Sequence, residues 1–270
     1  MKRHLKRLLG AIVYGIGMHR HLLGERAVIA LFHRVNDRLP GNPITCTTDE
    51  FRAYCDFFRR HFTVVSLGDL LSKLERRESV AGHLVITFDD GYKDNAAEAA
   101  AELKARQLPA CFFIATGFIG SNRIPWWDAQ RSITPEWMSW DDVRGLHGDG
   151  FEIGAHTVNH VDLAAVDGTE AEREIVESRQ RLTQELGEEV PFFSFPYGRP
   201  QNVTPHKREL VRRAGFKCCL SAHGGMVRPS ADPFDLKREP VSPWYLSPYH
   251  YGFEILLRRS PLPATSPYDV

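Results

Sequence analysis

Two short motifs supply side chains that together could hold a metal ion and activate a water molecule. The motif TFDDG places two adjacent carboxylates, Asp89 and Asp90, directly after an apolar run. The motif HTVNH places two imidazoles, on His156 and His160, four positions apart. Carboxylates and imidazoles are common zinc ligands, and a second carboxylate can act as a general base beside a metal-bound water. The two motifs therefore predict a catalytic metal site.

Asp89 and Asp90 stand where the apolar run 84–86 meets Gly91. In (β/α) barrels, residues at the carboxyl ends of strands point into the mouth of the active site. Adjacent residues at such an end diverge, so one carboxylate can bind a metal while the other stays free as a base. The alternative interpretation is an Asx-type turn, or an N-cap for a helix that begins after Lys93.

The spacing of the two histidines is typical of a chelating pair. On a helical turn, His156 and His160 would face the same side, as the zinc-binding pair of metalloproteases does. No glutamate lies between them, so the base must come from elsewhere, and Asp89 is the available candidate. The ligands Asp90, His156 and His160 would leave a position open for water, which is the pattern of a catalytic zinc site rather than a structural one. Zinc is favoured for this set, although Co²⁺, Ni²⁺ or Mn²⁺ could also bind.

Two more residues at the ends of predicted strands are candidates for the chemistry. Tyr197, in FPYG, lies in a turn whose backbone N–H could point at an oxyanion. His33, in LFHRV, ends the first predicted strand and could protonate a leaving amine. Taken alone, an ordinary aromatic turn explains Tyr197 equally well, and a histidine at a strand end is more often structural.

The elements that must position these residues alternate between short apolar runs and helical patterns, which favours βα units on a parallel sheet. The predicted strands are residues 28–32, 62–65, 84–88, 110–114, 151–155, 192–195 and 216–220. The predicted helices are residues 50–61, 95–106, 141–147, 169–186 and 206–214. Seven strands in a chain of 270 residues favour a single α/β domain built as a barrel or a strongly curved sheet.

Over roughly residues 27–240, the chain resembles the polysaccharide deacetylase family, also called the NodB homology domain or carbohydrate esterase family 4. TFDDG at residues 87–91 and the H-[ST]-x-x-H pattern at residues 156–160 carry the resemblance. The resemblance implies a distorted (β/α)7 barrel. It also implies that Asp89 is the catalytic base, and that the other aspartate and the two histidines hold zinc or another divalent ion. The implied reaction removes an N-acetyl or other acyl group from an amino sugar.

The chain departs from the family pattern in two places. Ser194 stands where the third motif, R-x-P-Y, has an arginine that holds the base carboxylate, whereas Tyr197 still matches the residue whose backbone helps to form the oxyanion hole. We suggest Arg238 as a substitute for the missing arginine. The late Leu-x-His motif that supplies the general acid is also absent. In some Gram-negative relatives that histidine comes from an early strand, and His33 resembles this arrangement.

The N-terminus combines basic and apolar residues. Four basic side chains, Lys2, Arg3, Lys6 and Arg7, precede an apolar stretch that ends at Met18. The stretch is too short to span a bilayer, and no signal-peptidase site of the A-x-A type follows it. A basic amphipathic helix over residues 1–26 would lie on an anionic membrane surface as a peripheral contact. The alternative interpretation is an ordinary helix packed on the domain. The chain is thus divided into this N-terminal helix, the deacetylase-like domain over residues 27–240, and a Pro-rich C-terminal extension over residues 241–270.

The net charge and the cysteine content bear on the kind of partner and on the cellular compartment. The formal net charge is zero, so the overall balance does not indicate a nucleic-acid partner. Five cysteines without a CxxC motif favour a reducing compartment. We therefore expect a cytoplasmic protein, peripheral on the inner membrane through its N-terminus, with a periplasmic location left open.

The expected partner is an N-acetylated amino sugar in a polysaccharide, an oligosaccharide or a lipid-linked saccharide. The Trp-rich segment 126–140 could stack on sugar rings, or could be packing. Alternatives on the same site are an O-acetyl esterase and a hydrolase of non-sugar amides. A catalytically silent carbohydrate-binding barrel would not need a free base beside a metal, and a structural zinc site would not leave a position open.

Overall fold

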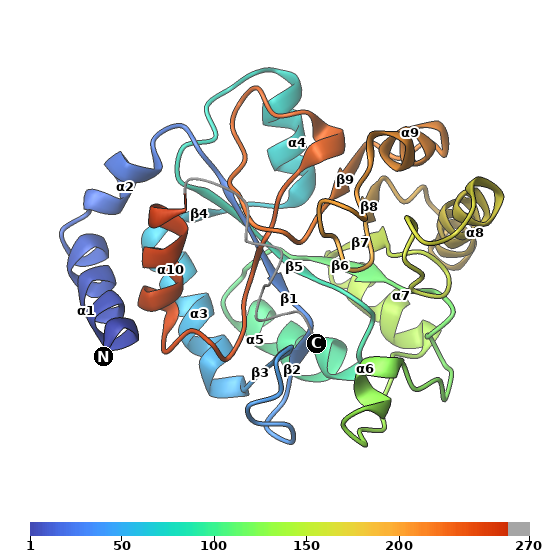
Figure 1. The fold of residues 1–270 in the computed structure, drawn as a ribbon, viewed down its shortest axis with the longest axis horizontal. Helices are drawn as coiled ribbons and strands as arrows, with labels where there is room; N and C mark the ends of the chain where they lie inside the picture. The colour runs from blue at the N-terminus through green and yellow to red at the C-terminus, as the bar shows by residue number, and fades with distance from the viewer. Residues whose placement is uncertain (259–270) are drawn as a thin grey trace.

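The computed structural model describes residues 1–258 and shows a curled parallel sheet surrounded by helices (Figure 1). The strand order is β10-β1-β5-β6-β7-β8-β9, with β4 beside the amino half of β5. The bounds are β1 Val28–Phe32, β4 Thr63–Val64, β5 His83–Phe88, β6 Cys111–Ile114, β7 Glu152–Ala155, β8 Phe192–Ser194, β9 Cys218–Leu220 and β10 Glu239–Pro240. A separate pair contains β2 (Arg34–Val35) and β3 (Thr45–Cys46). The predicted distorted (β/α)7 barrel is confirmed, with all seven predicted strands present.

The segment 236–240 closes the barrel, because it bridges the first and last strands. Leu236 pairs with a residue of β9, and Glu239 pairs with Ala30 of β1. Arg238 lies between these two pairings and is fully buried. The segment 236–240 therefore places the cation of Arg238, directly before β10, in the barrel interior. No apolar run in the sequence indicates this short strand.

Helices cover the outside of the sheet (Figure 1). They are α3 Thr48–His61, α5 Ala100–Ala105, α7 Trp140–Gly148, α8 Gly168–Leu186 and α9 Pro205–Arg213. A capping box at Thr47 and Glu50 starts α3, and Gly187 in the left-handed conformation ends α8. The predicted helix 95–106 begins as a π-helix over Asn95–Ala99 before it continues as α5.

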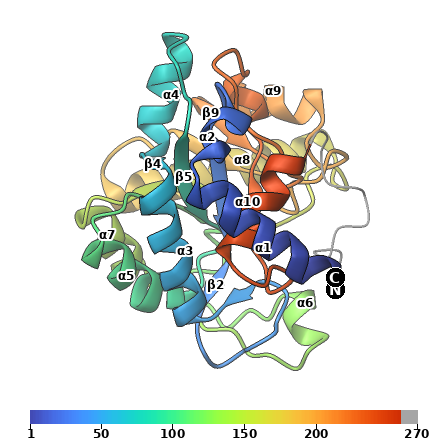
Figure 2. The ribbon, with the colours of Figure 1, turned by 90° about the vertical axis from the view of Figure 1, so that its left-hand side faces the viewer.

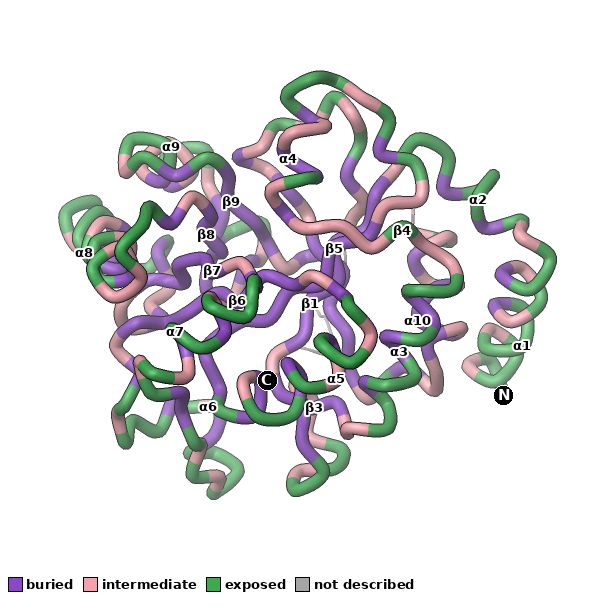
Figure 3. Tube along the Cα trace, turned by 180° about the vertical axis from the view of Figure 1, so that it is seen from behind, coloured by how far each residue is buried: buried purple, intermediate pink, exposed green. Residues whose placement is uncertain are grey.

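Two apolar cores lie on opposite faces of the strands, because successive side chains of a strand point to opposite sides. In β5, Leu84, Ile86 and Phe88 pack outward beneath the helices, whereas Val85 faces the barrel interior. Helix α4 (Leu67–Glu75), which is not among the predicted helices, packs its leucines on the interior core. Figure 3 shows buried strands at the centre of the molecule and exposed residues on the outer helices.

The terminal helices pack together on one side of the molecule (Figure 2). The expected N-terminal helix is two helices, α1 (Lys2–Gly15) and α2 (Met18–Leu23), because Gly17 adopts a positive φ of 78° between them. Within the C-terminal extension, α10 (Pro248–Leu257) contacts α1, α2 and α3. The rest of that extension, residues 259–270, lies outside the described residues. Within residues 1–258, every helix is too short or too polar to cross a membrane.

Candidate active site

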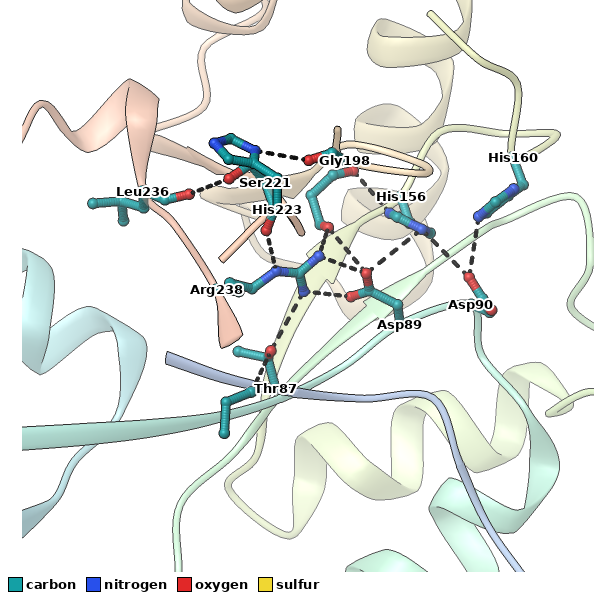
Figure 4. A network of polar contacts seen from close by, with 12 residues as sticks. Thr87, Asp89, Asp90, His156, His160, Gly198, Ser221, His223, Leu236 and Arg238 are labelled. Carbon is teal, nitrogen blue, oxygen red and sulfur yellow. Dashed lines mark hydrogen bonds and ion pairs between the residues drawn. The ribbon is translucent and has the colours of Figure 1, made fainter. Parts of the chain in front are cut away.

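The carboxyl ends of the strands bring the predicted aspartates and histidines together (Figure 4). Asp89 and Asp90 follow β5, and His156 follows β7. The alternation along β5 places Thr87 and Asp89 on the same side as Val85, which faces the barrel interior. Asp90 then diverges, because its φ of 79° turns the chain in the left-handed sense.

Arg238 forms a bidentate ion pair with Asp89. Its Nη1 donates to Asp89 Oδ1 at 2.7 Å, and its Nη2 donates to Asp89 Oδ2 at 2.6 Å. Ser194 Oγ accepts from Arg238 Nη2 at 2.6 Å and donates to Asp89 Oδ2 at 3.2 Å. Arg238 Nε donates to the carbonyl oxygen of Ser221 at 2.8 Å, and Nη1 donates to Thr87 Oγ1 at 3.3 Å. Ser194 stands in place of the arginine of the third motif, and Arg238, in the segment that closes the barrel, supplies the guanidinium to Asp89 instead.

Both aspartates are kept ionised by neighbouring positive groups. Burial raises the pKa of Asp89, but the charges of Arg238 and His156 and the Arg238 hydrogen bonds outweigh burial, so this pKa lies below its usual value. Burial also raises the pKa of Asp90, but the charge of His160 and the close imidazoles hold it well below the usual value. Two buried carboxylates that stay charged favour a cation between them and the imidazoles.

Asp90, His156 and His160 have ligand atoms within 4.8 Å of one another. Asp90 Oδ1 lies 3.2 Å from His160 Nε2 and 3.4 Å from His156 Nε2. Tetrahedral zinc with bonds of about 2.0–2.1 Å separates its ligand atoms by roughly 3.3 Å, so these distances suit one shared ion. Asp90 Oδ1 is also buried, and among residues 1–258 it accepts no hydrogen bond. This donor set fits a divalent metal ion.

The two histidines converge from an irregular turn, so the expected helical turn at residues 156–160 is wrong. Thr157 and His160 have positive φ values of 64° and 55°, which lie in the left-handed region that ordinary residues seldom occupy. The Nδ1 atom of His156 lies 2.8 Å from the carbonyl oxygen of Ser194. Such a contact fixes the ring orientation and leaves Nε2 for the ion.

Glu174 of α8 holds the peptide between the two histidines. Its buried carboxylate accepts from the backbone N–H groups of Val158 (2.9 Å) and Asn159 (2.7 Å), and from the Asn159 side chain. On the other side, the Gly117 N–H donates to the Val158 carbonyl at 2.7 Å, and a Cβ at Gly117 would lie 2.7 Å from that oxygen. Glu174 could not be predicted from the sequence, because one glutamate in a charged helical stretch carries no local signal.

The turn after β8 holds the Tyr197 backbone in the left-handed region, with a φ of 61°. A Cβ at the following Gly198 would lie 2.4 Å from the amide nitrogen of Ala222. The Gly198 carbonyl accepts from that amide at 2.8 Å and lies 3.0 Å from His223 Nδ1. Within residues 1–258 the Tyr197 N–H donates no hydrogen bond, which leaves it available for an oxyanion.

His33 follows β1 and lies near both aspartates. Burial lowers the pKa of His33, and the charges of Asp90 and Asp89 oppose this shift without cancelling it. The structure therefore brings all seven of the predicted site residues to one region, at the carboxyl ends of the strands.

The Trp-rich segment 126–140 is largely a loop that includes helix α6 (Trp126–Ala129), and this helix brings two of the four tryptophans of the segment to the site. The Trp127 ring lies 4.8 Å from the His160 ring. Trp126 is 43% exposed, and its Nε1 donates to the Tyr197 hydroxyl at 3.2 Å. The other two tryptophans of the segment are buried or half-buried. Trp126 is therefore the tryptophan of this segment that can present an aromatic face to a substrate.

Comparison with known proteins identifies the class. Residues 76–219, more than half of the chain, match the model of the polysaccharide deacetylase family, so the chain belongs to this family. YxkH of Bacillus subtilis (strain 168), which is named as a polysaccharide deacetylase, is 23% identical over 217 residues. That match covers 80% of this chain and 71% of YxkH.

Solved structures share the fold over most of the chain. The deacetylase PplD of Streptococcus pyogenes, solved in complex with acetate, has a TM-score of 0.71 and 20% identity, and the match covers 86% of this chain and 96% of PplD. IcaB of Ammonifex degensii has a TM-score of 0.71 and 23% identity, and the match covers 87% of this chain and 98% of IcaB. At these identities the likeness is one of fold.

Proposed function

We propose that this protein uses a bound divalent ion, most simply Zn²⁺, to remove an N-acetyl or related acyl group from an amino sugar. The substrate class is a polysaccharide, an oligosaccharide or a lipid-linked saccharide. Membership of the polysaccharide deacetylase family supports the reaction. One observation carries the proposal: a buried carboxylate, Asp89, is held ionised by Arg238 directly beside the convergent ligand group of Asp90, His156 and His160.

Each residue has a role that follows from its place. Asp90, His156 and His160 would hold the ion, which when bound lowers the pKa of water and polarises a carbonyl. Asp89 accepts the proton of the attacking water, and Arg238 fixes the orientation of its carboxylate. The Tyr197 N–H donates to the oxygen that gains charge as the acyl carbon becomes tetrahedral.

His33 donates a proton to the leaving amine nitrogen in this proposal. Its position near Asp89 and Asp90 supports the role. A His33→Ala variant should keep its metal and lose most of its turnover, since a positioned general acid contributes about 10²–10⁴-fold to the rate. Full activity in that variant, with normal metal content, would assign the proton to another donor.

The experiment compares metal content and acyl release in the same preparations. The full chain is reconstituted with Zn²⁺ or Co²⁺ and assayed for acetate and free amine released from N-acetylglucosamine oligosaccharides. We expect about one ion per chain. We expect almost no metal in the His156→Ala/His160→Ala variant, and normal metal without turnover in Asp89→Asn.

Two outcomes would overturn the proposal. A metal-loaded protein that releases acetate only from O-acetylated saccharides would be an esterase. A metal-loaded protein that binds saccharides without any release of acetate would be a carbohydrate-binding barrel. In both outcomes the protein still binds the metal ion, so they test the proposed reaction and not the assignment of the metal ligands.

A further inference from the structure

The outer face of α1 is an exposed apolar stripe. Its four most exposed members along the helix and its end are Leu5, Leu8, Ile12 and Ile16, which are 55%, 58%, 49% and 66% exposed. Eight of the twelve large apolar side chains that are exposed within residues 1–258 lie in residues 1–22. A contiguous exposed apolar surface of this kind marks an interaction site rather than ordinary surface variation.

The opposite face of α1 fixes the stripe in this outward position. Gly10 packs so closely on α10 that a Cβ there would lie 2.1 Å from the carbonyl oxygen of Tyr249. Tyr14 is buried against Gly252, where a Cβ would lie 2.7 Å from the Tyr14 ring. With 3.6 residues per turn, Gly10 and Tyr14 lie roughly opposite the stripe. The helix therefore docks through its small and aromatic face, and cannot turn the stripe inward without losing that contact.

The charge around the stripe has one sign. Residues 1–24 contain five Lys or Arg side chains and no Asp or Glu, in a chain whose formal net charge is zero. Lys2, Arg7 and Arg20 of this segment are exposed. Lys6 is paired with Glu254 of α10 at 2.6 Å, so it fastens the helix instead of facing outward. An apolar stripe on a segment whose only charges are positive complements a surface that is apolar beneath a layer of negative charge.

We propose that α1 and α2 form a docking surface for an anionic phospholipid bilayer. The 14 residues of α1 would lie in the plane of the membrane, with the stripe at the boundary between headgroups and acyl chains. The basic side chains would contact lipid phosphates, each with a contribution that salt screens. The bilayer would bury the apolar side chains of α1 that the fold leaves exposed, while α10 holds α1 against the barrel. This surface is independent of the catalytic proposal, because none of its residues belongs to the site.

The test is co-flotation of the full chain with vesicles of phosphatidylcholine and phosphatidylglycerol, alongside vesicles of phosphatidylcholine alone. We expect binding to the anionic vesicles that weakens as NaCl is added. Ile12→Glu should weaken binding by about tenfold or more, because it puts a charge in place of an aliphatic side chain that the bilayer would bury. Ile124→Glu is the matched control, since Ile124 and Ile12 are both 49% exposed, and it should bind as the parent does.

Three results would overturn the proposal. The parent could fail to float with anionic vesicles, or could bind both vesicle types equally at all salt concentrations. The parent could instead be a dimer in solution that Ile12→Glu converts to a monomer without any vesicle binding, which would make a second copy the occupant. Far-UV circular dichroism and the melting temperature of Ile12→Glu check that the variant is folded. We expect both to match the parent, because Ile12 lies on the exposed face of α1.

Discussion

Replacement of Arg238 by alanine would remove both the partner and the orienting group of Asp89. The pair is almost completely buried, with Arg238 0% and Asp89 3% exposed. Breaking a buried ion pair by removing one partner costs about 3–5 kcal/mol, because the remaining charge keeps its desolvation penalty. For a chain of this size each kcal/mol corresponds to roughly 2–4 °C in melting temperature. We therefore expect Arg238→Ala to melt at least about 6 °C below the parent.

The same change should move the pH dependence of catalysis in a known direction. Arg238 is the strongest of the groups that oppose the effect of burial on the pKa of Asp89. Without Arg238, burial raises this pKa, so a higher pH is needed to ionise the base. The acidic limb of the kcat/KM profile should shift to higher pH, and kcat/KM at neutral pH should fall by about 10²-fold, the lower end of what a positioned general base contributes.

The assay is the pH profile of acetate release, together with thermal melts, for the parent, Arg238→Ala and Arg238→Lys. Lysine keeps the charge but cannot form the bidentate pair, so it should be intermediate. The double variant Ser194→Arg/Arg238→Ala returns a guanidinium from β8, where Ser194 Oγ already lies 3.2 Å from the Asp89 carboxylate, and should recover part of the lost activity. If Arg238→Ala melts lower but keeps the parental kcat/KM and acidic limb, Arg238 is structural and the reasoning is refuted.

Three further predictions test other parts of the structure. Glu174→Ala should weaken metal affinity about 10–100-fold, because the turn between the histidines loses its outer-shell support; metal titration checks this, and unchanged affinity would contradict it. Trp126→Ala should raise KM for an oligosaccharide with little change in kcat, since Trp126 is exposed at the rim of the site. Steady-state kinetics on short and long substrates check this, and a fall in kcat with unchanged KM would contradict it. Burial lowers the pKa of His61 to about 4, so its contribution to stability is full above the usual pKa of about 6.5 and is lost as the pH falls from there towards 4. As the pH is lowered over this range, the melting temperature should fall more steeply for the parent than for His61→Phe. Equal slopes of melting temperature against pH would show that His61 is not a source of the acid sensitivity.

Local chain properties determined much of this protein. The alternation in β5 continues into the TFDDG motif, so the side of the strand on which Asp89 lies is set by neighbours in the sequence. The Asp90, His156 and His160 ligands could be predicted as a group because each follows an apolar strand, and the carboxyl ends of parallel strands meet at one edge. Strand positions were predictable where a buried strand is a continuous apolar run, as in β1 and β6.

Only the tertiary structure decided which groups support these ligands. Arg238 and Asp89 are 149 positions apart in the chain. Arg238 is placed by the strand that directly follows it, β10, whose two residues are too few to show any periodicity. Glu174 supports the histidine turn from a helix whose charged pattern resembles any solvated face. The sequence also showed that α1 has an apolar stripe, but not which face would be buried. That outcome depended on Gly10, because close helix packing at a glycine can hold a helix by its less apolar side.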